Sequence, residues 1–84
     1  MARSVVLRHE LSDGSWHYDW MIERADGRGL ITFRTGVRPD GAAAFEAERL
    51  ADHRVEYLEY EGEISGGRGR VSRVARGEVT IRSD

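Results

Sequence analysis

Residues 16–23, WHYDWMIE, form the stretch that decides the fold. Bulky apolar side chains stand at every second position, and mostly polar side chains stand between them. Successive side chains of a β-strand point to opposite faces, so this period of two predicts a strand. We expect the aromatic face, which carries Trp16 and Trp20, to pack in the core. The opposite face, with His17 and Asp19, is expected to meet solvent.

Shorter strand signals occur on both sides of this stretch. Apolar, β-branched runs at residues 4–9 and 30–33 predict the neighbouring strands, each separated from it by a polar, turn-forming segment. Residues 69–74 and 78–82 predict two further short strands around a turn at residues 75–77. The order of these signals is that of an antiparallel β-protein.

The remaining segments are less regular. Residues 42–52 have the alanine and glutamate content of a helix, although a strand over residues 45–50 fits as well. Residues 53–60 predict one short helical turn, and the glycines within residues 62–69 exclude a regular element there. We therefore predict a single, mostly β domain over residues 1–84.

Composition narrows the classes of function. The chain has 84 residues, no cysteine and a formal net charge of −2. This length suits one domain with a small core, and the lack of cysteine removes both disulfides and thiolate metal ligands. The near-neutral charge argues against coating nucleic acid through bulk electrostatics. No apolar run approaches the roughly 18 residues of a membrane span, so we expect a cytoplasmic protein without a membrane partner.

All 13 basic residues are arginine. Codon usage in a GC-rich genome produces such a bias, and so does selection for forked contacts with phosphate or carboxylate. Five of the arginines make the C-terminal third locally basic: Arg68, Arg70, Arg73, Arg76 and Arg82. This basic segment fits a nucleic-acid contact surface or an ordinary solvated surface.

Two histidines and one carboxylate form a candidate metal site. His17 and Asp19 are two residues apart on the predicted strand, so both side chains leave the same face. His9 ends the preceding strand and comes close to both if the two strands pair through residues 11–15. Two imidazoles and one carboxylate on a rigid hairpin suit a divalent transition metal with open positions for water or substrate. The alternative is a plain pattern of polar residues on a solvated face.

His53 and Tyr57 form a second candidate pair. They are four residues apart, so one helical turn places them on a common side. Near a metal, such a pair could donate hydrogen bonds to a phosphoryl group. The alternative is a surface helical face on which Tyr57 is a half-buried anchor.

Together these segments resemble the 3′-phosphoesterase domain of bacterial DNA ligase D. The first similar segment is VVLRH at residues 5–9 followed by HYDWMIE at residues 17–23, and the second is ADHRVEYLEYEG at residues 51–62. The two motifs occur in the order found in the family, and scattered matches extend over most of the chain.

The resemblance implies a small antiparallel β-barrel with one short helical turn and a divalent metal, manganese first, with zinc and cobalt as alternatives. It implies that His9, His17 and Asp19 are the metal ligands and that His53 and Tyr57 are catalytic residues at the scissile phosphate. The family removes 3′ phosphates and terminal ribonucleosides from DNA ends before breaks are sealed. The implied partners are therefore nucleic-acid 3′ ends and DNA-repair proteins. The resemblance also favours the strand over the helix for residues 45–50.

The chain departs from the family at several positions. Met21 stands where the family has an arginine, and the loop between His9 and His17 is longer. The lysine near the end of the third strand has no counterpart: Arg34 is the nearest cation, and Thr35 holds the aligned position. The family domain continues through further strands, so a shortened barrel is expected to close differently or to be completed by forming a homo-oligomer.

These observations predict a metal-dependent phosphoesterase acting on nucleic-acid 3′ ends in DNA repair. The alternative is a catalytically weak or inactive relative that serves as a nucleic-acid or repair-protein binding module. A small β domain with an unrelated ligand is a third reading.

Overall fold

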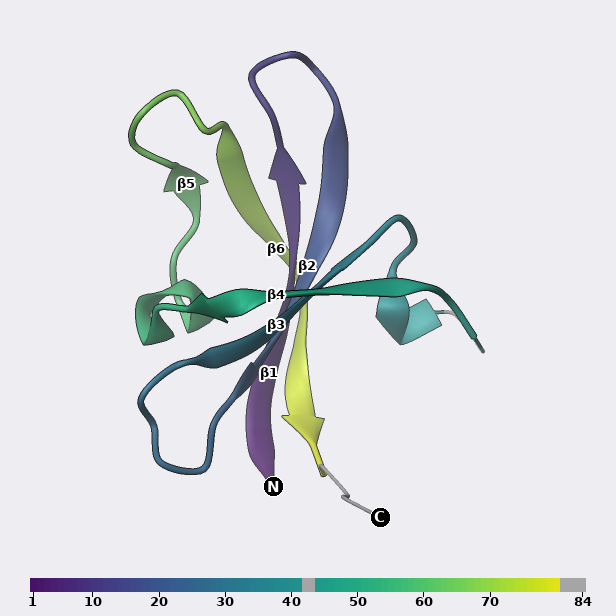
Figure 1. The fold of residues 1–84 in the computed structure, drawn as a ribbon, viewed down its shortest axis with the longest axis vertical. Helices are drawn as coiled ribbons and strands as arrows, with labels where there is room; N and C mark the ends of the chain where they lie inside the picture. The colour runs from purple at the N-terminus through teal and green to yellow at the C-terminus, as the bar shows by residue number, and fades with distance from the viewer. Residues whose placement is uncertain (42–43, 81–84) are drawn as a thin grey trace.

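The computed structural model describes residues 1–41 and 44–80, which form six strands and two short 3₁₀ helices. Figure 1 shows the elements in chain order: β1 (Ala2–Glu10), β2 (Trp16–Glu23), β3 (Leu30–Thr35), η1 (Pro39–Gly41), β4 (Ala47–His53), η2 (Val55–Leu58), β5 (Gly62–Glu63) and β6 (Arg70–Val79). The mostly β class and the short helical turn are confirmed. Within the described ranges no helix has the length and apolar content needed to cross a membrane.

The strands form one antiparallel sheet in the order β4-β3-β2-β1-β6-β5. Figure 1 shows how strongly this sheet twists, since β1 and β6 run along the long axis and β4 lies across them. Strands β4 and β5 stand at the two ends of the order, and no pairing joins them in the described part of the chain. The sheet is therefore not closed into a barrel there, and self-association through its edges stays a prediction.

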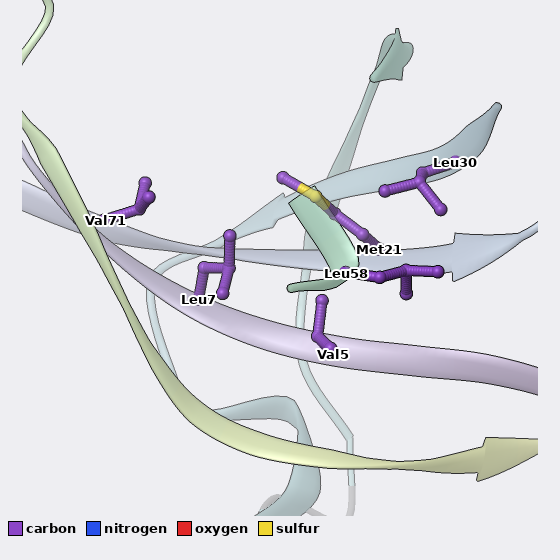
Figure 2. Close-up of a cluster of buried hydrophobic side chains, with 6 residues drawn as sticks. All are labelled: Val5, Leu7, Met21, Leu30, Leu58 and Val71. Atoms are coloured by element: carbon purple, nitrogen blue, oxygen red, sulfur yellow. The ribbon is translucent and has the colours of Figure 1, made fainter. Parts of the chain in front are cut away.

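The core lies on one face of the sheet and is covered by η2. Figure 2 shows its six buried side chains, which come from four strands and from η2: Val5, Leu7, Met21, Leu30, Leu58 and Val71. Leu58 is the η2 member of this cluster, and Val55 and Tyr57 of the same helix pack against it. Complete burial of one such side chain stabilises the fold by roughly 1.5–3 kcal/mol. The contact of Leu58 therefore fixes η2 over the sheet.

The main core cluster lies on the face of β2 opposite to the predicted one, although Ile22 on the predicted face is also buried. Met21 is 1% exposed and Asp19 is 3% exposed, whereas 46% of Trp16 is exposed. Directly paired residues of antiparallel strands share a face, and Met21 pairs with Val5 of β1 while Asp19 pairs with Leu7. The apolar side chains of β1 thus place the polar-looking face of β2 inside. The expectation that Trp16 packs in the core is wrong.

The C-terminal hairpin is also a wrong prediction. Residues 70–79 form the single strand β6, and the predicted strand at residues 78–82 lies partly outside the described residues. Strand β6 pairs with β1 along its whole length, with an irregularity opposite Val6 and Leu7. Gly77 pairs with Ser4 within this ladder instead of forming a turn. A long partner strand therefore decides the conformation where local turn signals suggest a break.

Of the two readings of residues 42–52, the strand is confirmed with shifted bounds. Strand β4 covers Ala47–His53, later than the expected residues 45–50, and residues 42–43 lie outside the described ranges. It pairs with β3 from Thr35 opposite Ala47 to Leu30 opposite His53. Pairing with a neighbouring strand here outweighs the helix propensity of alanine and glutamate.

Candidate metal centre

The β1–β2 hairpin brings the three predicted metal ligands together. His9 and His17 are directly paired, and Leu7 is paired with Asp19 two residues along. The loop that joins the strands is closed by a hydrogen bond of 2.8 Å from the Leu11 N–H to the Ser15 carbonyl. The predicted pairing through residues 11–15 is therefore confirmed, and the longer loop does not move His9 away from His17.

The Asp19 carboxylate lies between the two imidazoles. Its Oδ2 is 3.5 Å from Nδ1 of His9, and its Oδ1 is 3.1 Å from Nε2 of His17. One ligand atom of each residue lies within 4.8 Å of the others. Donor atoms about 2.1 Å from one metal ion are roughly 3.0–3.5 Å apart in tetrahedral or octahedral geometry. The cluster could therefore hold a metal ion.

The facing atoms of His17 and Asp19 have no hydrogen-bond partner among the described residues, because their 3.1 Å approach lacks hydrogen-bond geometry. The Asp19 side chain is only 4% exposed, and a buried carboxylate without a partner is costly. Burial, helped by the nearby Arg34 and His9, lowers the pKa of the His17 imidazole, although the facing Asp19 carboxylate raises it. A proton on His17 is thus disfavoured, and a bound cation would satisfy both atoms.

His53 and Tyr57 lie on the same groove as the cluster. This groove has a volume of about 570 Å³, and its walls include His9, Asp19, His53 and Tyr57. The rings of His53 and Tyr57 are edge to face with centroids 5.9 Å apart. Tyr57 also packs against the core, as expected of a half-buried anchor. The same side chain therefore anchors η2 and lines the groove. The fold thus brings both predicted catalytic residues to the open side of the cluster.

One ring nitrogen of His53 is committed to the main chain. Its Nδ1 is 2.9 Å from the carbonyl oxygen of Ala51, and a carbonyl can only accept a hydrogen bond. Nδ1 therefore carries a proton, and Nε2 is the nitrogen left for a ligand. In the neutral ring Nε2 accepts a proton, and in the charged ring it donates one.

Two arginines flank the cluster from different elements. Arg34 of β3 is directly paired with Asp19 and lines a shallow pocket beside His17. Arg68 lines the groove that His53 and Tyr57 share with His9. The sequence singled out Arg34 as the nearest cation but grouped Arg68 with a general basic surface. Nothing in the sequence signals that the turn before β6 reaches the end of β1.

Met21 lies at the floor of the groove and belongs to the buried core cluster. The position at which the resembled family has an arginine therefore supplies a core side chain here and no positive charge. Any cation that contacts a ligand in the groove has to come from another element.

The cluster offers two imidazole nitrogens and one carboxylate, a mixed donor set that divalent transition metals such as zinc, cobalt and manganese can use. The carboxylate and one imidazole open on the groove, where His53 and Tyr57 face the same space. In comparisons with known proteins, neither a protein-family model nor a curated protein matches this chain.

Proposed function

We propose that the protein is a metal-dependent phosphoesterase acting on nucleic-acid 3′ ends, from which it removes a 3′ phosphate or a 3′ ribonucleoside. One observation carries the proposal: the cluster of His9, His17 and Asp19 opens, through His9 and Asp19, on the groove that His53 and Tyr57 line. These are the five residues to which the resemblance to ligase D gives roles, and they come from elements far apart in the sequence.

Manganese is the proposed metal, with zinc and cobalt as alternatives. His9, His17 and Asp19 would hold it and leave further positions open. When bound, a divalent metal polarises a phosphoryl oxygen and orients an attacking water. The neutral state of His17, which burial favours, is the state in which imidazole binds a metal.

His53 and Tyr57 have complementary roles in this proposal. The Ala51 carbonyl holds the Nδ1–H of His53, so Nε2 exchanges the proton with the substrate. Tyr57 lines the same groove, and its hydroxyl donates a hydrogen bond to a phosphoryl oxygen of the substrate. Because the ring of Tyr57 packs against both His53 and the core, the pair is held in place before a substrate arrives.

Arg68 and Arg34 take over the positive charge that is lost at Met21. Arg68 stands on the groove beside His9, and Arg34 stands opposite Asp19. Two flanking arginines suit one terminal phosphate better than a long phosphate backbone, in keeping with the net charge of −2. The proposed partners are accordingly nucleic-acid 3′ ends, with DNA-repair proteins that present them.

A second candidate function is a binding module that retains the metal but does not turn over substrate. The specific observation in its favour is Met21, which is part of the core and gives the groove no charge. Loss of one preorganised charge contact costs on the order of 10²–10³ in rate. If neither arginine compensates, the protein binds ends without processing them.

The test uses the purified chain with Mn²⁺ and a DNA primer that ends in a 3′ phosphate or a single ribonucleotide. We expect the wild type to convert the 3′ phosphate to a 3′ hydroxyl, and to release the terminal ribonucleoside by hydrolysis, which leaves a 3′ phosphate that the same activity then removes. We expect neither reaction from His17→Ala or in the presence of a chelator. Tight Mn²⁺ binding without turnover would overturn the phosphoesterase and favour the binding module. Absence of Mn²⁺ binding would remove the mechanism of both.

A further inference from the structure

We infer that the turn between β5 and β6 positions the metal ligand His9, so that His9 binds through Nδ1. The main-chain carbonyl of Arg68 orients the ring, and Gly69 permits the close approach that puts this carbonyl in place. The inference rests on the proposed metal site but not on any reaction of a substrate.

The contact between His9 and the turn determines which ring nitrogen faces Asp19. Nε2 of His9 is 2.7 Å from the carbonyl oxygen of Arg68, and that oxygen can only accept a hydrogen bond. Nε2 therefore carries a proton. In the neutral ring Nδ1 then carries the lone pair, and it is this atom that lies 3.5 Å from Oδ2 of Asp19. Histidine ligands of metals commonly donate their second N–H to a carbonyl in this way.

Gly69 is the residue that allows the turn to reach β1. Its φ is +94°, and a Cβ at this position would lie 1.8 Å from the carbonyl oxygen of Glu10 and 3.0 Å from Cα of Leu11. Both contacts are to main-chain atoms, which cannot rotate away as a flexible side chain can. Since Glu10 directly follows His9, any larger residue at position 69 separates the turn from the metal ligand.

The turn is braced so that the Arg68 carbonyl has a defined position. The N–H of Ile64 donates to the Gly69 carbonyl over 2.8 Å, closing the two ends of the turn. The Nε–H of Arg68 donates to the Ser65 carbonyl, also over 2.8 Å. The side chain of Arg68 is thus folded along its own turn while its carbonyl points to His9.

Gly67 provides a matched control within the same turn. Its φ is +69°, and a Cβ there would meet nothing within 4 Å. Alanine at Gly67 or Gly69 therefore costs similar left-handed backbone strain, of roughly 1–2 kcal/mol. Only Gly69→Ala also collides with the main chain of β1. A difference between the two variants reports the close approach itself.

The experiment measures Mn²⁺ affinity from the free-ion EPR signal for the wild type, Gly67→Ala and Gly69→Ala. Disturbing the group that orients a ligand typically costs about 10–100-fold in metal affinity. We expect a loss of this size for Gly69→Ala and an affinity close to wild type for Gly67→Ala. Equal affinities of the two alanine variants would overturn the inference.

A second measurement needs no substitution. Long-range ¹H–¹⁵N NMR of the metal-free wild type reports which nitrogen of neutral His9 carries the proton. We expect the Nε2–H form, and a dominant Nδ1–H form contradicts the inference even if Gly69→Ala fails to fold. Turnover assays separate this result from the proposed function. If His9 carries its proton on Nε2 and Mn²⁺ affinity depends on Gly69, the inference holds even when the protein processes no 3′ end.

Discussion

His9 and His17 face each other as directly paired residues of β1 and β2, with ring centroids 4.9 Å apart and planes inclined at 70°. In this arrangement each of the two imidazoles directs one ring nitrogen to the same Asp19 carboxylate, one to each oxygen. Without a cation, the site is a buried carboxylate with an unpaired oxygen. The metal centre should therefore cost stability when metal-free and add stability when a metal is bound.

The first prediction concerns Asp19→Asn. The amide removes a buried charge and offers an N–H to His17, so we expect the metal-free protein to gain about 1 kcal/mol, or roughly 4–8 °C in Tm. The wild type at a Mn²⁺ concentration of 100 times Kd should gain about 2.7 kcal/mol, and Asp19→Asn should gain almost none. Thermal unfolding with a chelator and with Mn²⁺ measures both effects. A variant that is less stable in chelator would show that the carboxylate is satisfied without metal.

The second prediction is the pH dependence of the metal-free protein. The pKa of His17 is lowered by burial, so the folded state binds fewer protons than the unfolded state at pH values just below 6.5. Stability should be insensitive to His17 above this pH and should fall as the pH drops through the interval between 6.5 and the lowered pKa. His17→Gln should flatten this dependence in chelator. If stability falls with pH equally steeply in the wild type and in His17→Gln, the pH dependence belongs to another group.

The location of these ligands could be predicted because it depends on short-range regularities. A period of two puts His17 and Asp19 on one face, and a hairpin brings His9 to them. Which face of β2 carries the main core cluster could not be read in the same way, because Met21 on one face and Trp20 on the other are both apolar. That choice depends on Leu58, which lies far along the chain and covers the Met21 side.

The rest of the site depends on contacts that have no residue-specific signal. Spacing alone paired His53 with Tyr57 but did not place them at the metal cluster, which followed only from the resemblance to ligase D. The contact of Arg68 with His9 uses a carbonyl, and every residue has one. Only the glycine at position 69 marks the approach, and a glycine-rich turn does not show which strand it touches.

The third prediction separates the two functions of Arg68. Arg68→Ala keeps the main-chain carbonyl that orients His9 and the Ile64–Gly69 hydrogen bond that closes the turn. It removes only the exposed hydrogen bond from Arg68 to Ser65, so Mn²⁺ affinity should fall far less than turnover does. Loss of the guanidinium from the groove should lower turnover of a 3′-phosphate primer by on the order of 10²–10³. Arg28→Ala, in the exposed turn before β3, is the control with the same change in net charge. A proportional loss of Mn²⁺ affinity in Arg68→Ala would place the side chain in the metal centre instead.

The fourth prediction concerns the anchor of η2. Leu58→Ala leaves a cavity in the core cluster and should lower the free energy of unfolding by about 2–5 kcal/mol, measured by urea denaturation. Because η2 carries Tyr57, turnover should fall further than Mn²⁺ affinity does. Val37→Ala, at an exposed side chain, is the control and should change the free energy of unfolding and the turnover only slightly. A stability close to wild type in Leu58→Ala would mean that η2 is held by other contacts.

The fifth prediction concerns Asp52, which joins β4 to the end of β2. Its carboxylate accepts hydrogen bonds from Arg24 and, over 3.0 Å, from Arg49, and these bonds lower its pKa from 3.8 to about 2. The stabilising contribution is therefore fully present above pH 3.8 and is lost as the pH falls toward 2. Asp52→Asn should move acid unfolding, followed by circular dichroism, to higher pH. Asp26→Asn, in the turn after β2, is the matched control.

The same substitution should also affect the groove, because His53 directly follows Asp52 in the chain. Asp52→Asn should therefore raise KM for the 3′-phosphate primer. Mn²⁺ affinity should stay unchanged, since the metal ligands come from β1 and β2 alone.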